Sequence, residues 1–345
     1  MFRTPTTIVV GAGASADYGF PLGSGLRTKI ANLIDIRFEH FGSSLESGDH
    51  IIVECLRELS RNAGNNGNIN PFIPAARSIA AAMPLALSID NYLDAHRGDK
   101  DTIICGKLAI ARAILMAEKD SSLWFDHRHA ESFSLAAVEQ TWLSRFVNAL
   151  TEGVDASNLD SIFENVTIIS FNYDRCIKHF LRDALKTYYR LNDQSAADLL
   201  KSLRIFHPYG STGELPWEER NGVSFGSDQL HGRLLPIAHK IKTFTEQIED
   251  ETLVEQMRLS TQSARQIIFL GFGFHRQNIE LISAEMPRSC ERIFATAMNI
   301  SASDKVVIEN ILRSAFQPQY GSVKIAMHDG NCPSLFDSYW RSITA

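Results

Sequence analysis

Four short segments of the sequence carry residue types that suit the binding of a nucleotide. The first, Gly-Ala-Gly-Ala-Ser-Ala at 11–16, directly follows a β-branched run. A G-x-G-x-x-G/A turn between a strand and a helix lets the backbone approach a pyrophosphate closely and directs backbone N–H groups at it. Gly11, Ala12 and Gly13 would form this turn, and Ser15 would donate its hydroxyl to a phosphate or ribose. The alternative is a tight turn that binds nothing.

The second segment, Ser-Phe-Asn-Tyr-Asp-Arg at 170–175, follows the next buried strand-like run. Polar side chains at the carboxyl end of a strand lie in the crevice where open α/β sheets bind ligands. The amide of Asn172 both donates and accepts, so it can hold a water molecule or a ribose hydroxyl, with the Asp174 carboxylate beside it. In the alternative interpretation, Asn172 is the N-cap of the following helix and Asp174 lies in its first turn.

The third and fourth segments also follow strand-like runs. Phe-His-Pro-Tyr-Gly-Ser at 206–211 holds His207, and histidine is the side chain best suited to proton transfer near neutral pH. Phe-Leu-Gly-Phe-Gly-Phe at 269–274 holds Gly271 and Gly273, which allow a ligand to approach the backbone closely. A structural histidine and an empty glycine turn are the alternatives. Because all four segments end strands, we expect them to line one crevice.

Strand-like and helical patterns alternate along the chain around these segments. Strand-like runs occupy 6–10, 166–171, 203–206, 267–272, 292–298 and 323–327. Helical periodicity predicts helices from about 22–26 onward and at 176–188, 278–284, 304–316 and 334–343. Strands that alternate with helices predict an α/β fold with a mostly parallel, Rossmann-like sheet.

The region from 50 to 150 has a different texture. Periodicity rich in Ala and Leu predicts helices at 51–59, 75–93, 103–117 and 135–150. We interpret this region as a large helical insertion within a single domain that spans 1–345.

The dehydrogenase form of the glycine motif needs an acidic residue about 20 positions further on, at the end of a second strand. Asp35 has helical surroundings instead, which argues against a standard dehydrogenase.

The composition argues against several classes of protein. The 345 residues carry 34 Lys and Arg against 40 Asp and Glu, a net charge of −6, which argues against broad binding to nucleic acid. Hydrophobic residues make up 44%, too many for a disordered chain, yet no apolar run reaches the roughly 18 residues of a membrane span. The N-terminus shows no signal-peptide pattern, and the five cysteines include no C-x-x-C pair. We therefore expect a cytoplasmic protein without a cysteine-based zinc site.

The order of the motifs resembles that of the sirtuin (SIR2-like) family, and above all that of the bacterial SIR2-like proteins of anti-phage defence. The matching pieces are Gly-Ala-Gly-x-Ser at 11–15, Gly-Phe-Pro at 19–21, Phe-Asn-Tyr-Asp at 171–174, His207 with Tyr-Gly-Ser at 209–211, and Leu-Gly-Phe-Gly at 270–273. The resemblance covers about residues 6–300, and the helical insertion stays unmatched.

This resemblance implies an NAD+-binding site. In the family, the glycosidic bond to nicotinamide breaks through an oxocarbenium-like state, as in glycoside hydrolysis. Asn172 would position the attacking water or the ribose 2′-hydroxyl, and His207 would assist proton transfer from a ribose hydroxyl. The residues implied to contact NAD+ are Gly11, Ala12, Gly13, Ser15, Phe20, Pro21, Asp174, Gly210, Ser211, Gly271, Phe272 and Gly273.

The sequence departs from the family in two ways that bear on function. It lacks the four-cysteine zinc module and the Phe-Arg pair of the protein deacylases, so we expect NAD+ consumption without an acylated protein substrate and without a metal. The family often has histidine directly before Gly-Ser, where this chain has Tyr209. In an extended segment, His207 would face the same side from two positions back. His231 is the alternative for this role.

We therefore expect an NAD+ glycohydrolase that releases nicotinamide and ADP-ribose and serves anti-phage defence by depleting NAD+. Control would come from assembly into a homo-oligomer or from a partner protein such as a ring-forming ATPase. The alternative function is a regulatory or assembly module that binds NAD+ or ADP-ribose without turning it over. Protein deacylation is a third function, which the missing zinc module disfavours.

Three other segments allow more than one interpretation. Asp90, in a segment that resembles a recurrent one of SIR2-like proteins, would face either the NAD+ crevice or the solvent on a helix surface. Asp-His-Arg-His at 126–129 has ligand-type residues, but its spacing suits no usual zinc site and indicates a solvated loop. The stretch 210–232 is a candidate for a mobile lid or a partner surface.

Overall fold

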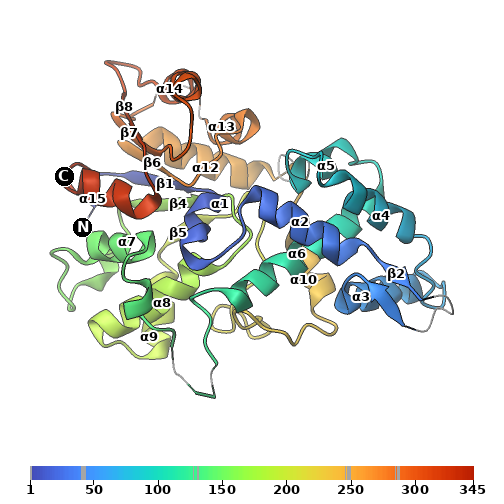
Figure 1. The fold of residues 1–345 in the computed structure, drawn as a ribbon. Coiled ribbons are helices and arrows are strands. Elements are labelled where there is room, and N and C mark those ends of the chain that lie inside the picture. The colour runs from blue at the N-terminus through green and yellow to red at the C-terminus, as the bar shows by residue number, and fades with distance from the viewer. Residues whose placement is uncertain are drawn as a thin grey trace.

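The structure, a computed structural model, describes residues 2–39, 44–126, 128–129, 132–244, 246, 250–283, 285 and 288–345. Six of the described strands form a sheet in the order β5-β4-β1-β6-β7-β8 (Figure 1), in which every neighbouring pair is parallel. The strands are β1 (Thr6–Val10), β4 (Val166–Ser170), β5 (Arg204–Phe206), β6 (Gln266–Leu270), β7 (Arg292–Thr296) and β8 (Lys324–His328). The predicted α/β fold with a Rossmann-like parallel sheet is confirmed.

The central strands of the sheet are buried on both faces. Every residue of β1, β4 and β6 is buried, as expected for parallel strands that helices cover on both sides. The chain runs from β1 outward to β4 and β5 and then returns to form β6, β7 and β8 on the other side of β1. The strand order therefore reverses between β1 and β6, and such a switch point is where open α/β sheets form a ligand crevice.

Helices cover the sheet and also gather beside it. Those next to the sheet are α1 (Ala12–Ser15), α7 (Trp142–Thr151), α8 (Cys176–Tyr189), α9 (Asp193–Leu200), α12 (Glu251–Ser263), α13 (Arg276–Ile282), α14 (Ala302–Phe316) and α15 (Cys332–Ile343). α7 packs against α8 and α15, whereas α13 packs against α12 and α14, which gives two helical layers. Figure 1 shows the remaining helices gathered to one side: α2 (Gly23–Ile34), α3 (His50–Asn62), α4 (Ile73–Ala82), α5 (Ile89–Ala95), α6 (Lys100–Asp120) and α10 (Leu234–Lys240).

Within 50–150 the chain is helical, and α6 lies at the centre of the group. α6 contacts α2, α3, α4, α5 and α10, and most of its residues are buried. The helical stretch predicted at 75–93, which Pro84 interrupts in the sequence, is two helices in the structure. Pro84 follows α4, and Ser88 starts α5 by accepting a hydrogen bond from the Asn91 backbone N–H. The helix predicted at 135–150 begins only at Trp142, after a 3-10 turn.

Several short elements do not appear in the sequence-based prediction. These are α9, α10, α12 and an antiparallel pair of strands, β2 (Arg37–Phe38) with β3 (Leu45–Ser47). α9 and α10 span two turns each, which is too short for hydrophobic periodicity to identify them. α12 is longer, but few of its residues are buried, so its apolar stripe is weak.

The sheet and the helical insertion share one hydrophobic core. Ile8 of β1, Leu56 of α3, Leu108 of α6 and Phe336 of α15 belong to one continuous cluster of buried side chains. The insertion therefore packs against the sheet through this core, and its helices can form one wall of a site at the switch point. Among the described residues, no helix is long and apolar enough to cross a membrane.

Candidate functional site

A cavity of about 1040 Å³ lies at the carboxyl ends of β1, β4 and β6. Small-molecule sites commonly measure roughly 300–1,000 Å³, so this cavity has room for an extended dinucleotide. Gly11, Asn172 and Gly271 line it from the strand ends, while Arg27 of α2 and Asp90 of α5 line it from the helical side. The cavity thus occupies the switch point of the sheet and is closed from the other side by the insertion.

Most of the residues predicted to contact NAD+ line this one cavity. They are Gly11, Ala12, Gly13, Ser15, Phe20, Pro21, Asn172, Asp174, Gly271, Phe272 and Gly273. The residues predicted from the same reasoning that do not line it are His207, Gly210 and Ser211. The structure therefore brings together the segments at the ends of β1, β4 and β6, and leaves most of the β5 segment outside.

The glycines of the first and fourth segments have a structural reason of their own. The Gly13 N–H donates to the Gly271 carbonyl at 2.9 Å, and a Cβ added at Gly11 would lie 2.7 Å from that same oxygen. Gly271 itself has a φ of +56°, and a Cβ there would overlap the β1 loop. The two loops interlock at backbone contact distance, so the glycine pattern is required by loop packing whether or not a ligand approaches.

Asn172 is held by a chain of hydrogen bonds that links the first two segments. Its Nδ2 donates to the Gly11 carbonyl at 3.0 Å and to Ser15 Oγ at 2.9 Å. The Ser15 hydroxyl in turn donates to Asp174 Oδ2 at 2.7 Å, and burial raises the pKa of the Asp174 carboxyl. Both amide hydrogens are thereby used, and Oδ1 remains as an acceptor for which no donor is described.

The alternative interpretation of Asn172 as a helix cap is wrong. α8 begins at Cys176, and its first free N–H, that of Cys176, donates to Asp174 Oδ1 at 3.1 Å. Asp174 thus satisfies the helix terminus with one oxygen and orients Ser15 with the other. Asn172 is free of this structural duty, which leaves its amide to the cavity.

His207 lies on the other side of the Asn172 backbone from the cavity. Its Nδ1 is 3.3 Å from the Asn172 carbonyl, and because a carbonyl only accepts, Nδ1 carries the proton. The ring lines a separate pocket of about 10 Å³ together with Lys178 and Glu218. Burial and the nearby Lys178 ammonium lower the pKa of His207 to about 4, so the ring is neutral at pH 7. His207 supports the backbone of Asn172 and does not face the cavity.

The rest of the β5 segment divides between the two pockets. Gly210 has a φ of +73°, and a Cβ there would overlap the Lys240 carbonyl at the end of α10, so its role is structural. Ser211 lines the small pocket. Tyr209 does line the large cavity, and its hydroxyl donates to Asn278 Oδ1 at 2.7 Å. Tyrosine therefore occupies the cavity position directly before Gly-Ser, and His231 lies near His50 with ring centroids 6.4 Å apart, outside the cavity lining.

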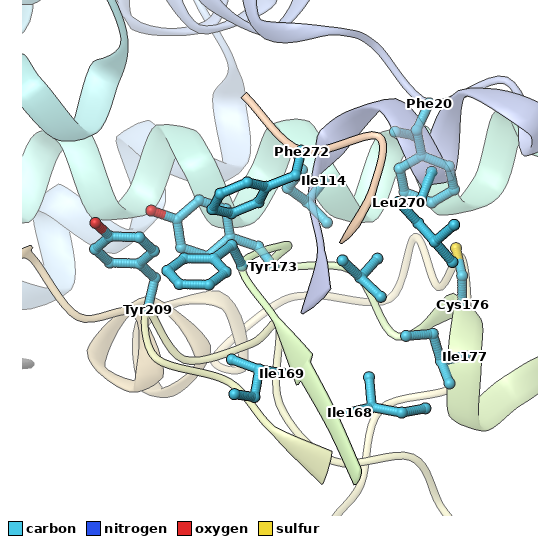
Figure 2. Close-up of a cluster of buried hydrophobic side chains, with 14 of the residues drawn as sticks. Phe20, Ile114, Ile168, Ile169, Tyr173, Cys176, Ile177, Tyr209, Leu270 and Phe272 are labelled. Carbon is cyan, nitrogen blue, oxygen red and sulfur yellow. The ribbon is translucent and has the colours of Figure 1, made fainter. Parts of the chain in front are cut away.

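An aromatic wall closes one side of the cavity. Phe171 packs on Phe272 with ring centroids 5.2 Å apart, and Tyr173 lies 6.4 Å from Tyr209. Figure 2 shows Tyr173 and Tyr209 side by side, with both hydroxyl oxygens directed to the same side, and Ile114 of α6 behind Phe272. Flat apolar faces of this kind suit the stacking of a nicotinamide or adenine ring.

The helical insertion and α2 contribute charged residues to the cavity wall, namely Asp90 and Asp94 of α5 and Arg27 of α2. Asp90, in the first turn of α5, is partly buried and accepts a hydrogen bond from the Tyr173 hydroxyl. Burial raises the pKa of this carboxyl. Arg27 donates to the Ala86 carbonyl and forms no ion pair with any described carboxylate, so its charge is available to a phosphate. Of the two placements considered for Asp90, the structure shows the one in the crevice.

The sequence analysis misses the residues at the far end of the cavity. They are Thr296 at the end of β7 with Met298, Asn299 and Ile300 after it, and Gly330 and Asn331 before α15 with Cys332 at its start. The Gly271 N–H donates to Thr296 Oγ1 at 2.8 Å, which joins this end to the β6 loop. Only the rule that parallel strand ends share one edge could have indicated them, because no motif marks the segment.

Two further segments lie outside the site. Asp35 pairs with Arg37 at 3.1 Å and does not line the cavity. In the predicted solvated loop 126–129, Asp126 pairs with Arg128 at 2.6 Å, while His127 lies outside the described residues. No group of three or more metal-ligating side chains occurs in the part of the chain that the structure describes.

The stretch 210–232 does not have the contacts of a mobile lid. Val223 and Phe225 are buried, and the Gly226 N–H donates to Glu118 Oε2 at 3.0 Å. The guanidinium of Arg175 donates to the Val223 carbonyl at 2.5 Å. These contacts anchor the stretch to α6 and to the start of α8.

Comparison with known proteins adds no relative to this picture. No protein-family model matches the sequence, and no curated protein matches it. The resemblance to the sirtuins stays a prediction that rests on the order of the motifs, and the function has to be argued from the cavity and its side chains.

Proposed function

We propose that the chain is an NAD+ glycohydrolase that cleaves the bond between nicotinamide and ribose and releases nicotinamide and ADP-ribose. The observation that carries this proposal is the orientation of Asn172 at the cavity wall by Gly11, Ser15 and Asp174. An amide fixed in this way presents one acceptor atom in a set direction, which is what the positioning of an attacking water or a ribose hydroxyl requires.

The charges around Asn172 suit the reaction. As the glycosidic bond breaks, positive charge develops on the ribose ring, and a buried carboxylate nearby stabilises it. Asp174 and Asp90 both line this part of the cavity. Arg27 lies in the wall and forms no ion pair with a described carboxylate, so a pyrophosphate can pair with it, and the aromatic wall offers faces for the two rings. The cavity thus has a group for each part of a dinucleotide.

The test uses the purified full chain mixed with NAD+ and measures nicotinamide and ADP-ribose by chromatography. We expect the wild type to release both in equal amounts. Asn172→Ala lowers the rate about 10²–10³-fold, because the positioned acceptor is lost. The matched control is Asn310→Ala, on the exposed face of α14, which keeps the wild-type rate. Equal rates in wild type and Asn172→Ala would refute the assignment of the site.

One observation favours the second function, a module that binds NAD+ or ADP-ribose without turnover. His207, the histidine predicted to move the proton, does not line the cavity, and Tyr209 stands in its place. Calorimetry separates the two functions. Binding of NAD+ without release of nicotinamide supports the module, and release supports the hydrolase.

The biological setting of the proposal comes from the resemblance to anti-phage SIR2-like proteins. We place the reaction in the cytoplasm, where depletion of NAD+ would halt an infected cell, and assign its control to a homo-oligomer or to a partner such as a ring-forming ATPase. The five cysteines are free and buried, which suits a reducing compartment. Cells that express the wild type should lose NAD+ and limit phage growth, whereas cells with Asn172→Ala should do neither.

A further inference from the structure

The cavity holds a carboxylate that is tied to the Asn172 segment although it comes from a distant part of the chain. Asp90 lies in the first turn of α5, whose N-cap Ser88 accepts from the Asn91 N–H at 3.0 Å. Its Oδ1 accepts a hydrogen bond from the hydroxyl of Tyr173, the residue that follows Asn172. The second oxygen, Oδ2, has no described side chain as a donor. Asp90 is therefore oriented at Oδ1 by Tyr173. Among the described residues, the other hydrogen bond to its carboxylate comes from its own backbone N–H, so no second residue holds Oδ2.

The position of Tyr173 links Asp90 to the place where bond cleavage would occur. Tyr173 is 5% exposed and packs beside Tyr209, so its ring has little freedom. The Tyr173 carbonyl accepts from the Thr212 N–H at 2.9 Å, which also fixes its backbone. Since Asn172 and Asp90 both line the cavity, Tyr173 sets the carboxylate relative to the Asn172 amide.

No histidine described at this part of the site competes for the role. His207 lies behind the Asn172 backbone, and His231 lies outside the cavity lining. His275 lines the cavity near Asp90, but its side chain is exposed at the start of α13 and no described hydrogen bond orients its ring. The base that the hydrolysis requires must therefore be sought among the carboxylates that line the cavity, which are Asp17, Asp90, Asp94 and Asp174. Asp174 uses both oxygens on Ser15 and Cys176, and Asp17 accepts from the Trp142 N–H. Asp90 is the one that is hydrogen-bonded to the residue next to Asn172.

We propose that Asp90 is the general base of the hydrolysis and that Tyr173 is its positioning residue; this inference rests on the proposed function. The free oxygen of Asp90 takes a proton from the water molecule whose oxygen forms a bond with C1′ of the nicotinamide ribose. The bond between C1′ and the ring nitrogen breaks, and its electron pair stays on nicotinamide, which leaves neutral. Asp90 then returns the proton to solvent. Water is the only co-reactant, and the products are nicotinamide, ADP-ribose and one proton.

The first arm of the test compares Asp90→Asn with the wild type by steady-state release of nicotinamide. We expect kcat to fall about 10²–10⁴-fold, the usual contribution of a general base, while KM changes only severalfold. Calorimetry with ADP-ribose checks that the variant still folds and binds. The matched control is Asp198→Asn on the exposed face of α9, which keeps the wild-type kcat.

The second arm uses the pH profile, which a merely structural role would not move. The titratable groups that act on Asp90 are Tyr173, Tyr209 and His275. The other charged groups of the α-helices that line the cavity are Asp94 of α5, Arg27 of α2 and Arg276 of α13, and Ile114 is the lining residue of α6. The Tyr173 hydrogen bond lowers the pKa of Asp90, against the burial that raises it. Tyr173→Phe removes that bond, so the acid limb of kcat should move to higher pH, and the alkaline rate should fall severalfold because the carboxylate is no longer positioned.

The outcomes separate this inference from the proposed function. An Asp90→Asn variant with the wild-type kcat, or a Tyr173→Phe variant with an unmoved acid limb, overturns the role of Asp90 and leaves the hydrolase standing. A wild type that binds NAD+ and releases no nicotinamide overturns both. Loss of kcat in Asp90→Asn together with a shifted limb in Tyr173→Phe supports the assignment.

Discussion

At the scale of single residues, the loops after β4 and β5 contain both side chains that line the cavity and side chains that only stabilise the backbone. Asn172 presents its amide to the cavity, and His207, 3.3 Å from the Asn172 carbonyl, supports the same residue from behind. Asp174 serves both the start of α8 and the Ser15 hydroxyl. Asn172 and His207 are thus in contact but have different roles. The side chain of Asn172 lines the cavity, whereas that of His207 lies on the other side of the backbone and stabilises it.

A pH prediction follows for His207. Burial lowers the pKa of His207 from 6.5 to about 4 in the folded chain. Between about pH 6.5 and pH 4, this histidine is therefore protonated in the unfolded chain and neutral in the folded chain. The free energy of unfolding therefore has its full value above pH 6.5 and falls by roughly 3 kcal/mol as the pH drops to about 4. His207→Gln, which keeps a donor for the Asn172 carbonyl, should lose less stability over this range in urea unfolding.

The control for this prediction is His231→Gln, an exposed residue outside the site, which should keep the pH dependence of the wild type. The same His207→Gln variant should retain far more nicotinamide release than Asn172→Ala, because the ring does not line the cavity. An unchanged acid dependence in His207→Gln would show that the ring titrates as it does in water.

At the scale of elements, two glycine loops act as one unit. The loop after β1 and the loop after β6 pack backbone against backbone through the hydrogen bond from Gly13 to Gly271. This contact fixes the position of Ser15, and Ser15 in turn fixes the amide of Asn172. The geometry of the site thus depends on a contact that contains no catalytic side chain at all.

Gly271→Ala tests this dependence. The added Cβ would lie 2.6 Å from the Gly13 Cα, at a φ of +56° that suits glycine, so we expect a loss of about 1–3 kcal/mol in the free energy of unfolding. NAD+ affinity should fall as well, measured by calorimetry. Gly98→Ala is the control, because nothing lies within 4 Å of its added Cβ. A Gly271→Ala chain as stable as the wild type would argue against the interlocked loops.

At the scale of the whole molecule, the insertion and the sheet form one site between them. The strand ends supply the loops and Asn172, while α2 and α5 supply Arg27 and Asp90. A buried ion pair joins the two parts: Arg175, at the start of α8, donates to Glu118 at the end of α6, and their side chains are only 3% and 0% exposed. The same pair holds the stretch 210–232 through Gly226 and Val223.

Removing one partner of the Arg175–Glu118 pair should lower the free energy of unfolding of the chain. Glu118→Gln keeps the shape but leaves the Arg175 guanidinium buried without a counter-charge, so we expect a loss of about 3–5 kcal/mol in urea unfolding. The surface pair of Asp198 with Lys201, 2.7 Å apart, offers the contrast, because Asp198→Asn should cost about 1 kcal/mol or less. Equal effects of the two substitutions would mean that the buried pair does not hold the insertion to the sheet.

The α/β fold with its parallel sheet could be predicted from the sequence alone, and so could the cavity-lining residues of the loops that follow β1, β4 and β6. The reason is that these features are local: a buried parallel strand is a run of apolar residues, and its carboxyl end is marked by glycine and polar residues directly after it. Strand ends such as those before Gly11 and Asn172 carry that signal within a few residues.

Only the tertiary structure decided which polar residues face the cavity. His207 and Tyr209 are two positions apart, so in an extended segment both side chains would face the same side. The chain instead turns at 207–210, and only Tyr209 lines the cavity. Asp90 and Tyr173 are 83 positions apart, and no spacing rule joins them. Contacts of this kind arise when the insertion folds back onto the strand ends, which depends on packing across the whole core.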